Sequence, residues 1–423
     1  MSRTDVKGLL RLAPLALGMG VVCAVLLIAL SELAEALQDL IWTALPEAAG
    51  FDSDAAWWLV LVLTVAGAAV GLIVWKWPGG AGADPAAAEL VAAPLPMRAL
   101  PGIAATATIG LAAGVSLGPE NPIVAICVAV VCFLGSRLAP KVPGPGWVGI
   151  AAAGTIGAMF GTPVAAALTL TESPGGDPDQ PLWSKLFAPL LAAGSGALTM
   201  QVLGTPVFAV DLPAYTGLAW RDLLTAPAVA AVAALLGLAA AVAFHWSHRA
   251  FGLVANPMLR TTIGGLVLGL LAVLGGTITM FKGLDEMKEL AAGDHGTGGL
   301  LLIVAVKILA LVVAATCGFR GGRIFPIVFV GVALGLLWSH VWDGAAPALA
   351  VGCAVLGLTL AVTRNGWLSV FMAATVVGDI ALLPLLCLAV LPAWLLVANA
   401  PQMVIDPAHA HTERTPARAA PAP

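Results

Sequence analysis

Apolar runs of about 20 residues follow one another along almost the whole chain. A helix of about 20 apolar residues crosses the hydrocarbon core of a bilayer, so each run is long enough to span a membrane. Three runs fall within 325–398, where their boundaries blur. The sequence therefore predicts an all-α polytopic membrane protein, with nine clear runs at 9–31, 55–76, 99–117, 123–140, 147–171, 184–206, 222–245, 261–281 and 299–318.

The connections between these runs are short and rich in glycine and proline. The 423 residues include 48 glycines and 30 prolines, while 60% of the chain is hydrophobic and only 10% is charged. Irregular backbone survives at membrane depth only where protein or a water-filled cavity surrounds it. We therefore expect short and broken helices, with close packing at the small-residue motifs GAAVG (67–71), GLAAG (110–114) and GVALG (331–335).

Several motifs of soluble proteins match the sequence only formally. GPGWVG (144–149) fits a dinucleotide pattern but follows no strand, and GVSLG (114–118) fits a hydrolase pattern without a strand-to-helix turn or a nearby histidine. The six cysteines lie in apolar segments without CxxC spacing, which indicates neither a zinc site nor disulfides. We therefore expect no enzyme activity, no cofactor, no metal site and no nucleic-acid partner.

Basic residues near the N-terminus indicate the orientation of the chain. Arg3, Lys7 and Arg11 precede or open the first apolar run, and no small-residue cleavage site follows. This pattern predicts a retained segment whose start lies on the cytoplasmic side of the cell (inner) membrane. Residues 406–423 are rich in proline and alanine, which predicts a disordered tail. We place both termini in the cytoplasm.

The stretch GVSLGPENPIV (114–124) contains the one charge between Arg98 and Arg137. That charge is Glu120, which stands between Pro119 and Pro122. Ionisable residues inside a membrane are costly and tend to line transport pathways. The alternative is an ordinary carboxylate in the first turn of a helix, bound by the free amides there. We favour a functional role for Glu120.

Two segments resemble each other in plan. Gly118 and Pro122 stand four apart, and Pro163 follows 41 residues after Pro122; Gly322 and Pro326 also stand four apart, and residue 366, a glycine, follows 40 residues after Pro326. Internal repeats are typical of transporters whose broken helices point their N-termini at a central site. Two such helix starts would attract an anion through free amides and the helix dipole. The alternative is a pair of ordinary helix breaks.

Three segments together resemble the CLC family of chloride channels and proton/chloride antiporters. Residues 98–122 align without a gap with the family's GxEGP segment, residues 317–335 with its GGxFxP segment, and residues 154–172 with a third family helix. The resemblance implies about 18 short, tilted helices in two inverted halves, about 55–206 and about 222–400, within a transmembrane domain of 1–400. It also implies a homodimer without a cofactor, and it places Glu120 at the family's external gating glutamate.

The sequence departs from the family where side chains bind the anion. The family's serine-containing turn falls on GGAGADP (79–85), where Ala81 replaces the serine, and its central tyrosine falls near Met403. Both hydroxyl ligands are therefore lost, whereas backbone amides at the helix starts still donate. The anion-binding residues that the resemblance implies are Gly118, Pro119, Asn121, Gly322, Arg323, Ile324, Phe325, Ala81 and Met403.

Other charged residues have two interpretations each. The internal proton-transferring glutamate of the antiporters aligns with Ser173, beside Glu172, which is either a proton carrier or a solvated residue at the end of an apolar run. Arg320 and Arg323 either attract the anion or bind carbonyls of a glycine-rich turn. Lys307 either pairs with an acid or extends to the interface.

These observations lead to one main functional hypothesis, in two versions, and one alternative. The main hypothesis is transport of chloride or a similar small anion through a pore gated by Glu120. We favour passive conduction over proton-coupled exchange, because Ser173 stands where the resemblance places the proton-transferring glutamate. The alternative is a degenerate relative with little chloride conduction, which serves as a sensor or regulator or carries another anion.

Overall fold

The computed structural model describes residues 6–405, apart from residues 78, 80, 88–89, 173–180, 204–207 and 343. Eight helical stretches in these residues are long and apolar enough to cross a membrane, and three shorter apolar helices accompany them. The predicted mixture of complete and short helices is thus confirmed. The predicted tail at 406–423 and Ser173 lie outside the described residues.

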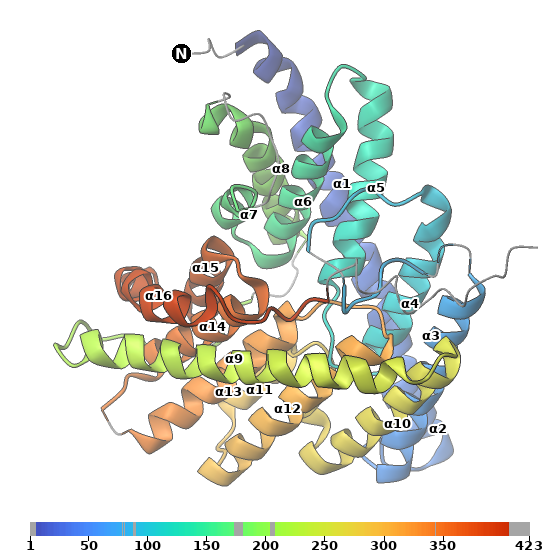
Figure 1. Cartoon of the computed structure of the whole chain (residues 1–423), viewed down its shortest axis with the longest axis vertical. Helices are drawn as coiled ribbons and strands as arrows, with labels where there is room; N and C mark the ends of the chain where they lie inside the picture. Colours follow the sequence, from blue (N-terminus) through green and yellow to red (C-terminus); the bar gives the residue numbers. More distant parts are fainter. Residues whose placement is uncertain are drawn as a thin grey trace, which may run out of the picture.

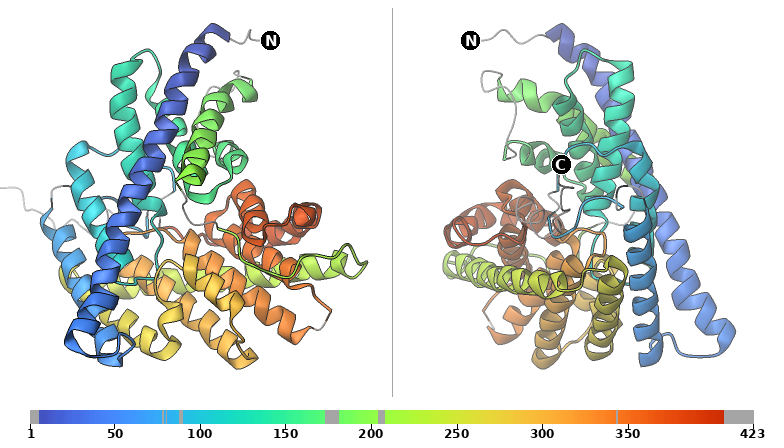
Figure 2. Two further views of the ribbon diagram at one scale, coloured as in Figure 1. Left: turned by 180° about the vertical axis from the view of Figure 1, so that it is seen from behind. Right: turned by 45° about the vertical axis from the view of Figure 1, so that its right-hand side comes forward.

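The helices are labelled in Figure 1. In the first part of the chain they are α1 (Val6–Asp39), a π-helical turn (Leu40–Ala44), α2 (Leu45–Ala49), α3 (Ala56–Lys76), a 3₁₀ turn (Met97–Ala99), α4 (Leu100–Ala112), α5 (Glu120–Leu138), α6 (Gly144–Phe160), α7 (Pro163–Thr169) and α8 (Leu182–Val202). Helices α6 to α8 gather at one end of the molecule, whereas α1 runs along one side over nearly its full height (Figure 2).

The second part of the chain begins with the long helix α9. Its helices are α9 (Asp222–Gly252), α10 (Pro257–Gly275), a 3₁₀ turn (Thr277–Thr279), α11 (Leu284–Ala292), α12 (Thr297–Cys317), α13 (Ile324–Val341), α14 (Pro347–Thr363), α15 (Gly366–Val377), a 3₁₀ turn (Ile380–Leu382) and α16 (Leu383–Val397). Helices α12 and α13 lie at the end of the molecule opposite α6 to α8 (Figure 1).

Two groups of three helices share the same plan. Helices α5, α6 and α7 contain 19, 17 and 7 residues, and helices α13, α14 and α15 contain 18, 17 and 12. The break between the last two helices of each group lies at Gly161 and at Arg364, both of which have a positive φ. The matched Gly/Pro spacing therefore marks corresponding helix starts, at Pro163 and Gly366.

Several predicted helix boundaries differ from those in the structure, and two of them have a clear physical reason. The first apolar run was expected to end at residue 31, but α1 continues to Asp39 because its added acidic residues, Glu32, Glu35 and Asp39, lie on an exposed face. The run 99–117 was expected to stay helical, but α4 ends at Ala112, and Gly114 has a φ of 84°. GLAAG therefore ends in a turn rather than forming a complete packing face.

The other two small-residue motifs do lie at close helix contacts. A Cβ at Gly331 or Gly335 of α13 would overlap the backbone of α14 at Val355 or Val351. A Cβ at Gly67 of α3 would likewise overlap the backbone of α10. Small residues let membrane helices approach closely, so these motifs set the spacing between α13 and α14 and between α3 and α10.

Candidate functional site

The starts of α5 and α13 are joined directly through their preceding glycines. Gly118 N–H donates to Gly322 C=O at 2.9 Å, and Gly322 N–H donates to Gly118 C=O at 2.7 Å. This pair forms an isolated antiparallel β-bridge between residues 204 positions apart. Two of the motifs that the sequence placed in separate halves therefore meet at one point, with both helix starts beside it.

Glu120 is the first residue of α5 and is completely buried at this junction. Its Oε1 accepts a hydrogen bond of 2.6 Å from the backbone amide of Phe325, in the first turn of α13. Its Oε2 is buried and has no hydrogen-bond partner among the described residues. The carboxylate packs against both glycines of the bridge, since a Cβ on Gly118 or Gly322 would overlap it.

This arrangement has an energetic consequence. A buried polar oxygen that lacks a hydrogen bond costs about 1–3 kcal/mol, and such exceptions call for a specific explanation. The carboxylate occupies a site that a helix start offers to any anion. Glu120 therefore occupies, through one of its two oxygens, a position at the start of α13 that suits an anion.

Arg323 and Phe325, at the start of α13, lie beside this carboxylate. Arg323 is the residue directly before α13, is 8% exposed and interacts electrostatically with Glu120. Its guanidinium carbon lies 5.8 Å from the ring centroid of Phe244 on α9. Ile324, the first residue of α13, is also buried. The positive charge stays at the helix start, next to the carboxylate.

The ring of Phe325 belongs to an aromatic cluster that sequence reasoning missed. Its centroid lies 5.6 Å from that of Phe160, at the end of α6, and 5.0 Å from that of Phe208, in the segment before α9. All three rings are buried. The only sequence signal was the position of Phe160 directly before the helix break at FGTP. These rings form an apolar wall behind the amide that binds Glu120.

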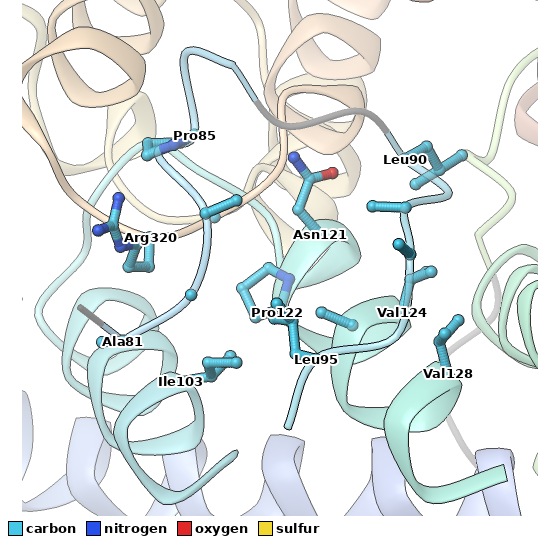
Figure 3. A pocket seen from close by; sticks show the side chains of 16 residues that line it. Ala81, Pro85, Leu90, Leu95, Ile103, Asn121, Pro122, Val124, Val128 and Arg320 are labelled. Carbon is cyan, nitrogen blue, oxygen red and sulfur yellow. The ribbon is translucent and has the colours of Figure 1, made fainter. Parts of the chain in front are cut away.

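A small pocket of about 50 Å³ opens beside the start of α5 (Figure 3). Ala81, Asn121 and Arg320 line it, together with mainly apolar residues of the segment 82–95 and of α5. A water molecule needs only about 10–15 Å³, so the pocket has room for a small anion. The structure thus brings together Ala81 and Asn121, which the sequence implicated separately.

Met403 lies close to the same irregular segment. Its side chain is completely buried, and two residues later Ile405 N–H donates to Ala86 C=O at 2.8 Å. A hydrogen bond therefore joins the chain next to the 79–85 turn to the chain next to Met403, the two places that the resemblance aligns with a serine and a tyrosine. In this chain both positions carry apolar side chains.

Glu172 binds a different helix start. Its Oε2 accepts from Gly366 N–H at 2.9 Å, and its Oε1 accepts from Trp367 N–H at 3.0 Å, both at the start of α15. These contacts are exposed to solvent. Glu172 therefore caps α15 and does not share the helix start that binds Glu120.

Lys307 does not extend to the membrane interface. Its side chain is completely buried, and its ammonium group donates to the carbonyls of Met280 and Phe281 at 2.6 and 3.0 Å. Glu286 on α11 interacts with it electrostatically. The interfacial alternative was therefore wrong, and the main partners of Lys307 are backbone carbonyls that the sequence did not indicate.

The fold and the site define a class of membrane protein. Two groups of short helices meet at paired glycines, and their N-termini surround a buried carboxylate, which is an arrangement suited to anions. A model of the family described as "Voltage gated chloride channel" matches residues 66–398. The chain belongs to this family, the CLC family, whose members are transporters rather than enzymes.

Relatives and solved structures agree with this family. Proteins named as the ion-transport protein YfeO, from Escherichia coli strain E24377A and from Shigella boydii strain Sb227, are 46% identical over 392 residues, which cover 92% of this chain and 94% of YfeO. A CLC-type fluoride/proton antiporter has a TM-score of 0.76 at 20% identity and covers 95% of this chain and 98% of its own. A slow cyanobacterial chloride/proton antiporter has a TM-score of 0.79 at 15% identity, over 92% and 96%.

Proposed function

We propose that this protein transports chloride or a similar small anion across the cell membrane through a pore gated by Glu120. The observation that carries the proposal is the carboxylate of Glu120, buried on the Phe325 amide beside the Gly118–Gly322 bridge. Family membership supplies the class of transport. The geometry supports Glu120 as the gate, because its carboxylate occupies the Phe325 amide that an anion would use.

The gate follows from competition for one helix start. The deprotonated carboxylate binds the Phe325 amide and excludes the anion. Protonation removes its charge and weakens this hydrogen bond, since bonds to ionised acceptors are about twice as strong as neutral ones. The side chain then leaves, and the anion binds the amides of α13 near Arg323. Anion movement thereby depends on the pH at the side from which Glu120 takes its proton.

Arg320 and Asn121 extend the proposed pathway away from the gate. Both line the pocket beside the start of α5, and the positive charge of Arg320 favours an anion there. Ala81 and Met403 offer no hydroxyl groups, so backbone amides and arginine provide the attraction. We expect weaker and less selective chloride binding than hydroxyl ligands would give.

The contacts of Glu172 support a role as a helix cap rather than as a proton carrier. Its carboxylate oxygens bind the amides of Gly366 and Trp367, and a carboxylate at a helix N-terminus is stabilising. We therefore favour passive conduction over stoichiometric proton exchange. We further propose a homodimer in the cell (inner) membrane, with both termini in the cytoplasm.

An anion-flux assay in proteoliposomes tests the function directly. Purified protein is reconstituted, and efflux of chloride, bromide, nitrate and fluoride is measured against protein-free vesicles. We expect efflux of at least one of these anions. Absence of efflux, together with absence of anion binding by isothermal titration calorimetry, would support the degenerate relative instead. Proton movement driven by an anion gradient would contradict passive conduction.

A further inference from the structure

Lys307 is a buried cation whose contacts lead toward the gate. It lies in the middle of α12, and its ammonium group binds the carbonyls of Met280 and Phe281, in the turn between α10 and α11. The same group lies 4.8 Å from the ring centroid of Phe329 on α13, and Glu286 attracts it from α11. A buried ammonium is costly unless hydrogen bonds and charges compensate it, and here two carbonyls do so.

The turn that Lys307 binds has a strained backbone. Phe281 has a φ of 54°, in the left-handed region that aromatic residues rarely adopt. Such a conformation costs about 1–3 kcal/mol and persists only when its surroundings hold it. The carbonyl of Phe281 is one of the two that Lys307 binds. Lys307 therefore helps to hold this turn in its strained form.

The strained Met280–Phe281 turn also holds the loop that precedes Glu120. Phe281 N–H donates to Gly114 C=O at 2.9 Å. A Cβ on Gly114 would meet the end of the Met280 side chain, so the two segments pack without space between them. Gly114 begins the irregular segment 114–119, which leads through the Gly118–Gly322 bridge to Glu120. The second part of the chain thus fixes the first at two points.

We propose that Lys307 is a positioning residue for the gate, which it serves by fixing the Met280–Phe281 turn against Gly114. The role of Glu120 as a gate rests on the proposed function. The positioning of the segment 114–119 by Lys307 does not depend on it. Loss of the ammonium group leaves two carbonyls without their donor and releases the Phe281–Gly114 hydrogen bond. The carboxylate of Glu120 is then held less firmly on the Phe325 amide.

Hydrogen–deuterium exchange measures the positioning without any transport. We expect amides of the segment 114–119 to exchange about tenfold faster in Lys307→Met than in the wild type, since the hydrogen bonds lost involve a charged donor. Lys307→Arg keeps a cationic donor and should restore slow exchange. Lys282→Met makes the same change one residue after the turn and is the matched control. Unchanged exchange in a folded Lys307→Met protein would overturn the proposal.

A second variant keeps the test valid if Lys307→Met does not fold. Gly114→Ala places a methyl group against Met280, at a position whose φ is 84°, and disturbs the same contact while Lys307 stays intact. We expect fast exchange of the segment 114–119 in this variant also. Slow exchange there, in a folded protein, would show that the turn does not fix the loop.

The pH profile of anion flux links positioning to gating. A less firmly held carboxylate leaves the helix start more easily, so the midpoint of the pH dependence in Lys307→Met should rise by about one pH unit, and Lys307→Arg should return it. A faster exchange with an unchanged midpoint would refute the link to the gate. If the wild type shows no flux, the proposed function fails, whereas the exchange result still decides the positioning.

Discussion

Two carboxylates of this protein bind helix starts in the second part of the chain, and they do so in different surroundings. Glu120 is completely buried, binds one amide of α13 through one oxygen, and leaves its other oxygen without a hydrogen-bond partner among the described residues. Glu172 is exposed and binds two amides of α15, one through each oxygen. The contact between a carboxylate and a helix start is therefore incomplete and buried at Glu120, whereas it is complete and exposed to solvent at Glu172.

Under the proposed function, this difference distinguishes a gate, Glu120, from a helix cap, Glu172. A complete, exposed pair contributes little more than an ordinary helix cap, about 0.5–2 kcal/mol. A buried carboxylate that binds the helix start through only one oxygen is in an energetically unfavourable environment, so protonation or an incoming anion can displace it. We propose Glu120 as the functional residue because of its burial and its unpaired oxygen, since a carboxylate at a helix start also occurs at Glu172.

The largest effect is expected from a methyl group at the glycine of the buried site. Gly322→Ala places a Cβ where the Glu120 carboxylate lies, and it should change anion flux by about tenfold or more, because the carboxylate can no longer bind the Phe325 amide as before. The matched control is Gly366→Ala, whose Cβ would lie 3.5 Å from Glu172 Oε1, an ordinary contact. If Gly322→Ala and Gly366→Ala changed anion flux in proteoliposomes by the same factor, the sites of Glu120 and Glu172 would not differ in function.

A smaller effect on anion flux is expected when the positive charge of Arg323, beside Glu120, is removed. Arg323 interacts electrostatically with Glu120, and its positive charge favours the ionised carboxylate. In Arg323→Met the proton is bound more easily, so the gate should open at a higher pH, with a midpoint about one pH unit above that of the wild type. Flux measured across a pH series checks this shift. A midpoint that moves to lower pH would contradict the assigned direction.

The smallest effect is expected at the exposed site. Glu172→Gln retains an acceptor oxygen but removes the charge at the start of α15, which should lower stability by less than about 1 kcal/mol, because solvent screens the interaction. Thermal unfolding in detergent measures this change. The pH profile of flux should stay that of the wild type; a displaced profile would return Glu172 to a role in proton transfer.

Local patterns in the sequence predicted the class of the fold and the positions of the central helix starts. Hydropathy predicted the membrane helices, and the Gly/Pro motifs predicted breaks that lie next to the observed starts of α5 and α13. These features depend on a few neighbouring residues, which a sequence displays directly. The close packing at Gly331 and Gly335 was predicted for the same reason.

Contacts between distant segments were not predictable from local patterns. The Gly118–Gly322 bridge joins backbone groups, which have no side-chain signature. The aromatic contacts of Phe160 and Phe208 depend on how three separate segments meet, and Lys307 binds carbonyls 26 and 27 residues away. The length of α1 was underestimated because its acidic residues lie on an exposed face, which hydropathy alone does not distinguish from a loop.

The pH dependence of anion flux in Glu120→Gln tests the central claim most directly. Glutamine matches glutamate in size but does not titrate, so the variant should conduct at all pH values between about 5 and 8, whereas the wild type should conduct better as the pH falls. Glu172→Gln, reconstituted in parallel, should keep the wild-type profile. A Glu120→Gln protein that conducts with an unchanged pH dependence would contradict the assignment of Glu120 as the gate.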